Sequence, residues 1–244
     1  MPKPKTAEIG KKIIYLQEVS STNEYAKKIA SEMPEGTVVI AKKQTKGKGR
    51  KNRRWASPEG GLWLSVILKP DVEAKDIPKI VFVGALAVVD TLAEFGIEAG
   101  IKWPNDVWVD NKKICGILTE GRLGEFVILG IGLNVNNDIP SELIGSATSM
   151  RLLLGRELNL DKVLWTLLGN LERWYKLIQE RKFSIVMSAV KDKCFILGRW
   201  VEVINDESKV EGEVIDIAED GTLIIQTSKG LMKIFYGDIS LRLR

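Results

Sequence analysis

The chain has 244 residues, of which 45% are hydrophobic, and it carries 36 lysines and arginines against 32 acidic residues. This composition is typical of a globular protein with a packed core, and no apolar run reaches the roughly 18 residues of a membrane-spanning helix. Histidine is absent from the sequence, which excludes Ser-His-Asp and Cys-His catalysis and most zinc sites. Cys115 and Cys194 are too few for a disulfide framework, and residues 1–5 lack the apolar core of a signal peptide, so we expect a cytoplasmic protein.

The first two thirds of the chain predict a mixture of strands and helices. Ser21 and Glu24 have the spacing of a capping box, so we expect a helix that begins at Ser21 and ends near Pro34. Runs of apolar and β-branched residues predict strands, and longer apolar runs predict helices. The expected strands are 37–41, 62–68, 99–102, 107–109, 114–119 and 126–133, with turns at 110–112 and 121–124. The expected helices are a buried one at 77–95, ended by Gly96, and two more at 160–179 and 183–193.

From Arg199 the pattern changes to short alternating strands separated by polar turns. The expected strands are 200–204, 209–217, 223–227 and 231–239, with turns at 206–208, 219–221 and 228–230. Four or five short strands in about 45 residues predict a small β-barrel. We therefore expect two domains, a larger one over residues 1–197 and a small one over residues 198–244.

Positive charge is concentrated in one segment of the chain. Between Lys42 and Arg54 there are eight cations and no acid, whereas the rest of the chain has a net charge of −4. Gly47 and Gly49 within this segment allow a close backbone approach, and glycines combined with cations can cradle an anion. Because like charges repel, we expect this loop to be mobile until an anion binds.

The composition of this basic segment alone fits a solvated face or a nucleic-acid-binding patch equally well. The spacing does not match a Walker A loop, which requires Gly, four residues and then Gly-Lys-Ser/Thr. A dinucleotide-binding loop is excluded as well, because Asn52 stands where the third glycine belongs and a strand follows instead of a helix.

A second informative block is Lys102-Trp103-Pro104-Asn105-Asp106, which precedes the predicted hairpin. Pro104 favours an extended conformation at the residue before it, and Asn-Asp favours a turn. Lys113 begins the second strand of the hairpin, which can carry its ammonium group back toward Asp106. A plain hairpin with a solvated edge lysine explains the same pattern.

The third block is Gly130-Ile131-Gly132-Leu133-Asn134-Val135-Asn136. Glycine inside an apolar strand is costly unless something approaches the backbone closely. A flat ligand lying on the sheet would explain these glycines, and a β-bulge is the alternative explanation.

Taken together, these motifs resemble the ordered motifs of biotin protein ligases, with a match that runs from Tyr15 to Ser149. The segments that carry the resemblance are Ser21–Asn23, Gln44 with Gly47–Arg50, Lys102–Asp106 with Lys113, and Gly130–Asn134. The resemblance implies an α/β (α+β) fold, in which a mixed sheet flanked by helices is similar to that of class II tRNA synthetases. It also implies a small SH3-like β-barrel at the C-terminus.

The reaction implied by the resemblance is the formation of biotinyl-AMP from biotin and ATP, with Mg²⁺, followed by biotin transfer to a lysine of a biotin carboxyl carrier protein. In this reaction a carboxylate and an α-phosphate, both anions, must approach each other. One cation about 4 Å from a phosphate oxygen contributes about 4 kcal/mol of electrostatic attraction at an effective dielectric constant near 20. The implied catalytic residues are therefore Lys113, Arg50 and Asp106. Asp106 either orients Lys113 or binds Mg²⁺, and the sequence does not choose between these roles.

The implied binding residues combine neutral hydrogen-bonding groups, glycines, cations and aromatic side chains. For biotin they are Ser21, Thr22, Asn23, Gln44, Gly47, Lys48, Gly49, Arg50, Trp63, Lys113, Gly116, Leu118 and Gly132. For ATP they are Lys48, Arg50, Arg53, Trp55, Lys102, Trp103, Asn105, Asp106, Lys113 and Asn134. The loop departs from the family pattern at Lys48, where arginine is common, and at Asn52, where glycine is common. Lysine keeps the positive charge but cannot form the paired hydrogen bonds of an arginine guanidinium. Asparagine, like glycine, can adopt left-handed backbone angles.

Two other functions remain open at this stage. A lipoate-type protein ligase would share the scaffold and the adenylation chemistry. A nucleic-acid-binding module would explain the basic segment and would bind with a steep salt dependence, but it leaves Trp103–Asp106 and Lys113 unexplained. About 20 residues precede Ser21, too few for a winged-helix DNA-binding domain, so we expect a short form of the family with neither nucleic acid nor membrane as a partner. The resemblance allows a homodimer.

Overall fold

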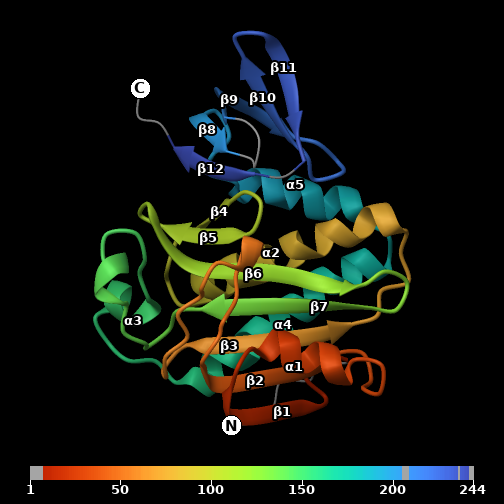
Figure 1. The fold of residues 1–244 in the computed structure, drawn as a ribbon, viewed down its shortest axis with the longest axis vertical. Coiled ribbons are helices and arrows are strands. Elements are labelled where there is room, and N and C mark those ends of the chain that lie inside the picture. Colours follow the sequence, from red (N-terminus) through yellow and green to blue (C-terminus); the bar gives the residue numbers. More distant parts are fainter. Residues whose placement is uncertain (1–7, 205–208, 236, 242–244) are drawn as a thin grey trace.

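A seven-stranded mixed sheet organises the larger part of the molecule (Figure 1). The structure is a computed structural model that describes residues 8–204, 209–235 and 237–241. The strand order is β1-β2-β3-β7-β6-β5-β4; β1 and β2 are parallel, and all other neighbouring strands are antiparallel. The strands are β1 (Ile13–Val19), β2 (Thr37–Gln44), β3 (Leu62–Leu68), β4 (Gly100–Lys102), β5 (Asp106–Val109), β6 (Lys112–Arg122) and β7 (Phe126–Leu133).

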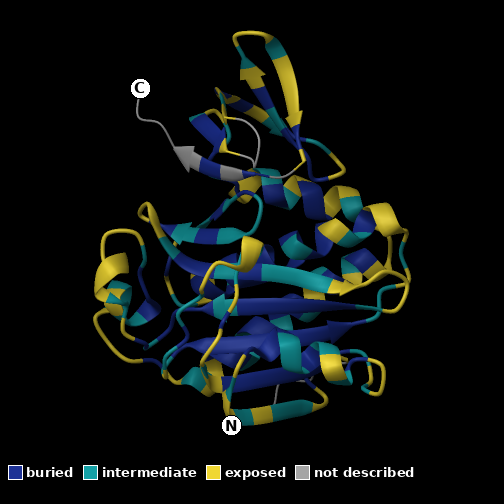
Figure 2. Ribbon diagram, in the orientation of Figure 1, coloured by how far each residue is buried: buried dark blue, intermediate teal, exposed yellow. Residues whose placement is uncertain are grey.

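The helices cover the two faces of this sheet unequally. On one face, α2 (Ile80–Glu94) packs against β6 and β7, and α4 (Leu160–Gln179) and α5 (Phe183–Lys193) pack against α2. Eleven of the 15 residues of α2 are buried, because the sheet and both neighbouring helices surround it. This layer forms the main core, and Figure 2 shows the buried strands beneath it.

The opposite face carries only the short helix α1 (Thr22–Ile29), which packs on β2, β3 and β7. A second, smaller core of Ala26, Ala30, Val39, Ile67 and Ile128 holds it there. The remainder of this face is crossed by the loop between β2 and β3, which passes in front of β7 and β6 in Figure 1. A sheet face covered by a loop instead of a helix leaves room for a ligand.

The C-terminal strands form a separate five-stranded antiparallel sheet in the order β11-β10-β9-β8-β12. They are β8 (Trp200–Ile204), β9 (Lys209–Ile217), β10 (Leu223–Thr227), β11 (Gly230–Ile234) and β12 (Asp238–Leu241). The indole Nε1 of Trp103 donates a hydrogen bond of 2.9 Å to the carbonyl of Gly221, which ties this sheet to the end of β4. Figure 1 shows the small sheet resting on the side of α5.

The predicted fold class is confirmed, since a mixed sheet flanked by helices is followed by a small antiparallel β unit. Seven elements match their predicted bounds: β3, β7, β8, β9, β10, α4 and α5. The boundary between residues 197 and 198 stays a prediction. The predicted turn at 206–208 and the N-terminal residues 1–5 lie outside the described residues.

Other elements differ from the prediction for identifiable reasons. The helix expected at 77–95 is divided, because Pro78 lies in a 3₁₀ segment (Ala74–Lys79) that precedes α2. The strand expected at 231–239 is two strands, β11 and β12. Helix α1 ends at Ile29, before Pro34, and β6 continues through the turn expected at 121–124 as far as Arg122. Neither β1 nor the short helix α3 (Met150–Leu154) was predicted.

Within the described part of the chain, none of the helices combines the length and apolar character needed to cross a bilayer.

Candidate active site

A cavity of about 280 Å³ opens on the face of the sheet that carries α1. Its walls are the N-terminus of α1, the β2–β3 loop, the exposed sides of β6 and β7, and the segment after β7. Sixteen of the predicted site residues line it together: Ser21, Thr22, Asn23, Gln44, Lys48, Gly49, Arg50, Arg53, Trp55, Asn105, Asp106, Lys113, Gly116, Leu118, Gly132 and Asn134. Residues from five separate sequence segments therefore meet in one place.

The floor of the cavity is flat because glycines occupy the side of the sheet that faces it. Gly116 and Gly132 are directly paired between β6 and β7. The indole of Trp55 lies against both, and a Cβ at Gly132 would overlap its Nε1 atom. A Cβ at Gly130 would similarly overlap the Asn23 amide. Strand β7 pairs on both sides without a register shift, so the glycines serve close approach, and the alternative of a β-bulge in β7 is wrong.

A β-bulge does occur in the neighbouring hairpin, where it directs Lys113 into the cavity. Val107 pairs with Cys115 but Trp108 pairs with Lys113, so β6 has one extra residue at this point. Successive residues of a regular strand point to opposite faces, and Lys113 would otherwise face away from Gly116. With the bulge, a Cβ at Gly116 would lie only 3.4 Å from the Lys113 Nζ.

The electrostatic centre of the cavity is the ion pair between Lys113 and Asp106. The Lys113 Nζ lies 2.6 Å from the Asp106 Oδ1 and 5.0 Å from the centroid of the Trp55 ring. Among the described residues that line the cavity, Asp106 is the only acidic one, whereas five are cations: Lys48, Arg50, Arg53, Arg54 and Lys113. The cavity is therefore suited to an anionic ligand.

The basic loop is a distorted hairpin. Isolated bridges join Gln44 to Ser57 and Lys48 to Arg54. Asn52 has a φ of 56°, which confirms the prediction that asparagine adopts a left-handed conformation there. A Cβ at Gly47 would overlap the Trp55 carbonyl oxygen, so this glycine shapes the loop and does not line the cavity.

Arg50 lies between the hairpin and the C-terminal sheet. Its Nη1 donates to the Asn105 Oδ1 at 3.2 Å and to the Gly237 carbonyl at 3.4 Å. Asn105 is itself fixed, since its Nδ2 donates to the Ile117 carbonyl at 2.8 Å. The Arg50 guanidinium thus contacts one of the predicted ATP-binding residues directly.

At the other end of the cavity, neutral groups at the start of α1 form a hydrogen-bonded cluster. The backbone N–H of Thr22 donates to the Gln44 Oε1 at 2.8 Å, and the Gln44 Nε2 donates to the Ser57 Oγ at 2.8 Å. The Ser65 Oγ lies 2.8 Å from the Thr22 Oγ1 and 2.6 Å from the Asn23 Oδ1. Ser65 was not predicted as a site residue, although it is the one polar residue in an apolar strand.

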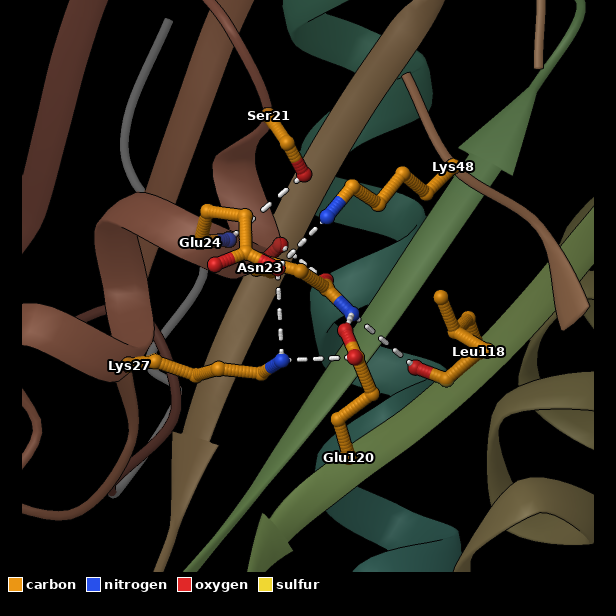
Figure 3. A network of polar contacts seen from close by, with 8 residues as sticks. Ser21, Asn23, Glu24, Lys27, Lys48, Leu118 and Glu120 are labelled. Carbon is orange, nitrogen blue, oxygen red and sulfur yellow. Dashed lines mark hydrogen bonds and ion pairs between the residues drawn. The ribbon is translucent and has the colours of Figure 1, made fainter. Parts of the chain in front are cut away.

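Charged residues surround this cluster (Figure 3). The Lys48 Nζ lies 3.0 Å from the Glu24 Oε1, and Lys27 contacts Glu24 at 3.4 Å and Glu120 at 2.6 Å. The hydrogen bond from Lys48, followed by the charges of Lys27 and Lys48, outweighs partial burial and lowers the pKa of Glu24. Ser21 caps α1, because its Oγ accepts from the backbone N–H of Glu24. The acidic side chain of Glu24 contacts Lys27 and Lys48, and so holds the basic loop against α1.

Three other predicted residues lie outside the cavity wall. Trp63 is fully buried, donates from Nε1 to the Pro58 carbonyl at 2.7 Å, and meets the Trp55 ring edge to face at 6.5 Å. Trp63 is therefore shielded from the cavity and supports Trp55. Trp103 is turned toward the C-terminal sheet, and the Lys102 Nζ lies 3.9 Å from the centroid of the Trp108 ring.

The segment after β7 forms a wall that was not predicted. Its lining residues are Asn137, Ile139, Pro140, Leu143, Ser146 and Ala147. Asn134 holds this segment, because its Nδ2 donates to the Thr148 carbonyl at 2.9 Å and its Oδ1 accepts from Asn137 at 3.1 Å. The segment has no regular hydrophobic period that could have indicated its position.

In the described residues there is no cluster of three or more His, Cys, Asp or Glu side chains that could hold a metal ion. Mg²⁺ that accompanies a nucleotide needs only one or two carboxylates, because phosphates and water complete its coordination. Asp106 fits that requirement.

Comparison with known proteins identifies the family. The model described as "Biotin/lipoate A/B protein ligase family" matches residues 15–136, and the model "Biotin protein ligase C terminal domain" matches residues 196–242. The "Bifunctional ligase/repressor BirA" of Bacillus subtilis is 36% identical over 247 residues, which cover 97% of this chain and 76% of that protein. The "Biotin--[acetyl-CoA-carboxylase] ligase" of Mycobacterium tuberculosis is 32% identical over 216 residues, which cover 84% of this chain and 79% of that protein.

A solved structure agrees with these relatives. The biotin protein ligase from Aquifex aeolicus in complex with biotin and ATP superposes with a TM-score of 0.86 at 35% identity, and the match covers 95% of this chain and 99% of that one. The resemblance inferred from the motifs is thereby confirmed: the chain belongs to the biotin protein ligase family.

Proposed function

We propose that this chain activates biotin with ATP to form biotinyl-AMP and pyrophosphate, and then transfers the biotinyl group to a lysine of a biotin carboxyl carrier protein. The observation that carries the proposal is the arrangement of one cavity. Neutral hydrogen-bonding groups gather at its α1 end, the Lys113–Asp106 pair lies at the other end, and four further cations line the cavity.

This arrangement suits a ligand that has a neutral polar ring and an anionic tail. The cyclic urea of biotin offers N–H donors and a carbonyl acceptor, which match the hydroxyl and amide groups of Ser21, Thr22 and Gln44. Leu118 and the Trp55 indole, which lies against Gly116 and Gly132, provide a flat surface for the apolar part of the molecule. The biotin carboxylate would then point toward Lys113.

Catalysis depends on bringing that carboxylate to the α-phosphate of ATP. A carboxylate oxygen forms a bond to the α-phosphorus while the bond to pyrophosphate breaks. Lys113, Arg50 and Lys48 would offset the repulsion between the two anions, each by about 4 kcal/mol at 4 Å and an effective dielectric constant near 20. Asp106 orients the Lys113 ammonium group, and the lysine amine of the carrier then attacks the acyl carbon as AMP leaves.

The nucleotide would occupy the side of the cavity formed by Arg53, Trp55, Asn105 and Asn134, with Lys102 and Trp103 farther out. Mg²⁺ bound with ATP would neutralise phosphate charge, and Asp106 is the carboxylate in the cavity that could contact it. The folded loop would exclude water from the reactive anhydride.

A lipoate-type ligase is the second candidate, because one family model that matches the chain includes lipoate ligases. The hydrogen-bonding cluster at Thr22 favours biotin, since the dithiolane ring of lipoate offers no N–H group. The experiment compares ATP-dependent labelling of a purified biotin carboxyl carrier domain with biotin and with lipoate, with an acceptor-lysine-to-arginine variant as the control. Labelling with biotin alone, at that lysine, supports the proposal, and labelling with lipoate alone overturns it.

The carrier protein is the one macromolecular partner that the proposal requires. We place the reaction in the cytoplasm, where reduced thiols at Cys115 and Cys194 are stable. The basic loop is assigned to the adenylate, so a fluorescent DNA duplex should show no saturable binding at physiological salt.

A further inference from the structure

A chain of hydrogen bonds connects the Thr22 hydroxyl, on the cavity wall, to the Glu120 carboxylate on β6, and Figure 3 shows its end at Asn23, Glu120 and Lys27. The Thr22 Oγ1 lies 2.8 Å from the Ser65 Oγ, which lies 2.6 Å from the Asn23 Oδ1. The Asn23 Nδ2 lies 2.7 Å from the Glu120 Oε2, and the Glu120 Oε1 is 2.6 Å from the Lys27 Nζ. Thr22, Ser65 and Asn23 thus connect the cavity to the Lys27–Glu120 ion pair, which the proposed mechanism does not use.

The chemistry of these groups fixes the direction of each hydrogen bond. An ionised carboxylate only accepts hydrogen bonds, so the Asn23 amide must turn its NH₂ group toward Glu120. The Leu118 carbonyl, 3.5 Å from the same nitrogen, favours the same orientation. The Asn23 carbonyl oxygen therefore faces Ser65, and the single proton of the Ser65 hydroxyl is donated to it.

The same reasoning fixes the Thr22 hydroxyl. The Ser65 oxygen, having donated its proton to Asn23, can only accept from Thr22. The other polar neighbour of the Thr22 Oγ1 is the Gln44 Oε1 at 3.1 Å, which is a carbonyl oxygen and also only accepts. The Thr22 proton is consequently directed into the protein, and its lone pairs remain for a ligand in the cavity.

We propose that Glu120 is a positioning residue that acts through Asn23 and Ser65 to fix the Thr22 hydroxyl as a hydrogen-bond acceptor and so selects a ligand that offers an N–H group at this point. The inference rests on the proposed function, in which the N–H group belongs to the cyclic urea of biotin. It assigns a role in ligand selection to a residue that does not line the cavity.

The surroundings leave this network little freedom to rearrange. Any side chain at Gly130 would overlap the Asn23 amide, so the asparagine lies directly against β7. Lys27 holds one oxygen of Glu120 and leaves the other for Asn23. Burial alone would lower the pKa of Lys27, but the hydrogen bond and charge of Glu120, followed by Glu24, raise it, so Lys27 stays charged.

The decisive variant is Glu120→Gln, which keeps the shape of the side chain. The charged Lys27 will take the amide oxygen, which leaves the NH₂ group of the new side chain facing Asn23. Asn23 must then turn its own oxygen toward position 120 and its NH₂ group toward Ser65. The Ser65 proton is redirected to one of the two lone pairs of the Thr22 Oγ1, so a single lone pair is left for the ligand and the acceptor is weakened.

Isothermal titration with biotin should show affinity about tenfold weaker for Glu120→Gln than for the wild type, the effect of losing one hydrogen bond. Lys27→Met alone should bind within about twofold of the wild type, because Glu120 still accepts from Asn23. The double variant Lys27→Met/Glu120→Gln should recover most of the loss, because the amide oxygen is then free to turn to Asn23. If Glu120 acted on folding alone, the double variant would recover none of the lost biotin affinity. That result would overturn the inference.

A second measurement uses the wild-type protein and does not depend on the folding of a variant. Two carbamate analogues of biotin, each with one ring N–H replaced by oxygen, serve as probes. One isomer should bind the wild type about tenfold more weakly than the other, and Glu120→Gln should lose this preference. Equal binding of both isomers to the wild type would contradict an acceptor at Thr22. If biotin neither binds nor supports pyrophosphate release, the proposed function itself fails. If biotin binds and supports pyrophosphate release, but Glu120→Gln still prefers one carbamate isomer, only this inference fails.

Discussion

At the scale of single residues, Lys113 has the largest part in the proposed reaction. The bulge in the β5–β6 hairpin turns its side chain into the cavity, and Asp106 holds the ammonium group at 2.6 Å. A preorganised cation of this kind offsets the electrostatic repulsion between two anions, here a carboxylate and a phosphate, as they approach each other.

Replacement of Lys113 by alanine should therefore reduce adenylate formation by roughly a hundredfold or more, the effect of losing one preorganised donor. Single-turnover formation of biotinyl-AMP is the measurement. Lys112→Ala is the matched control, because Lys112 is the exposed neighbour on the same strand and lies outside the cavity. Near-normal adenylation by a folded Lys113→Ala protein would remove Lys113 from the mechanism.

Arg50 has a different expected role, which is retention of the adenylate. Its guanidinium reaches Asn105 and the Gly237 carbonyl, and it can bind a phosphate through two hydrogen bonds. Arg50→Gly should hold biotinyl-AMP roughly 10–100-fold more weakly, since a charge-assisted hydrogen bond contributes about 1.5–3 kcal/mol. The escaping anhydride should then label lysines of an unrelated bystander protein.

Biotinylation of that bystander protein is measured with ATP and biotin present. Lys51→Gly is the control, because it increases backbone freedom in the same short turn and keeps the Arg50 guanidinium. Bystander labelling at the wild-type level by Arg50→Gly, with adenylate still formed, would show that another residue retains the intermediate.

At the scale of elements, the β2–β3 loop should respond to ligand. The repulsion among its cations is relieved when an anion binds, so the loop should become protected. Trypsin should cleave within residues 46–54 quickly in the free protein and several-fold more slowly with biotin and ATP. Cleavage after the exposed Arg122, which lies outside the cavity, provides the internal control. Equal protection at both places would indicate general stabilisation and no loop ordering.

Two helical glycines give a stability prediction that combines helix propensity with packing. A Cβ at Gly169 in α4 would meet nothing within 4 Å, whereas a Cβ at Gly84 in α2 would lie 3.1 Å from Ile117 and Leu129 on the sheet. Gly169→Ala should stabilise the protein by about 0.5–1 kcal/mol, because alanine loses less conformational entropy in a helix. Gly84→Ala should give no such gain. Urea denaturation compares the two, and equal stabilisation would show that α2 packs less tightly on the sheet than described.

The elements that could be predicted from the sequence are those whose pattern is local. Strand β7 and helix α4 match their expected bounds because turns or helix-capping residues delimit regular apolar runs. Strand β1 was missed because its residues alternate only weakly, and it is half exposed at the edge of the sheet. Pairing with β2, a contact distant in sequence, establishes it as a strand.

The candidate site divides in the same way. The glycines and cations of the cavity could be predicted from the sequence. Glycine destabilises an apolar strand, and like charges repel one another within a loop, so both patterns indicate a ligand. The contribution of Ser65, Glu120 and residues 137–147 could not be predicted, because only the folded chain brings the first two to Asn23 and the last segment to the cavity wall. Trp63 shows the opposite error: an aromatic residue close to the cavity in sequence is covered by Trp55 and Pro58 in space.

At the scale of the whole molecule, the C-terminal sheet contacts the larger part of the chain next to the cavity, although residues 21–147 supply the lining. Arg50 touches Gly237, Trp103 donates to Gly221, and the Lys191 Nζ forms an ion pair of 2.8 Å with Asp216. We infer that residues 198–244 form a small domain that supports the nucleotide side of the cavity. The two parts would then act together when the loop closes over the adenylate.

In the proposed reaction, one cavity joins a biotin carboxylate to the α-phosphate of ATP. The most direct test is to incubate the purified protein with ATP, Mg²⁺ and biotin, without any acceptor, and to identify the bound product by mass spectrometry. We expect biotinyl-AMP at about one equivalent per active site, with matching release of pyrophosphate. Bound biotin and ATP that remain unreacted, or an adenylate that forms with lipoate and not with biotin, would contradict the proposed reaction.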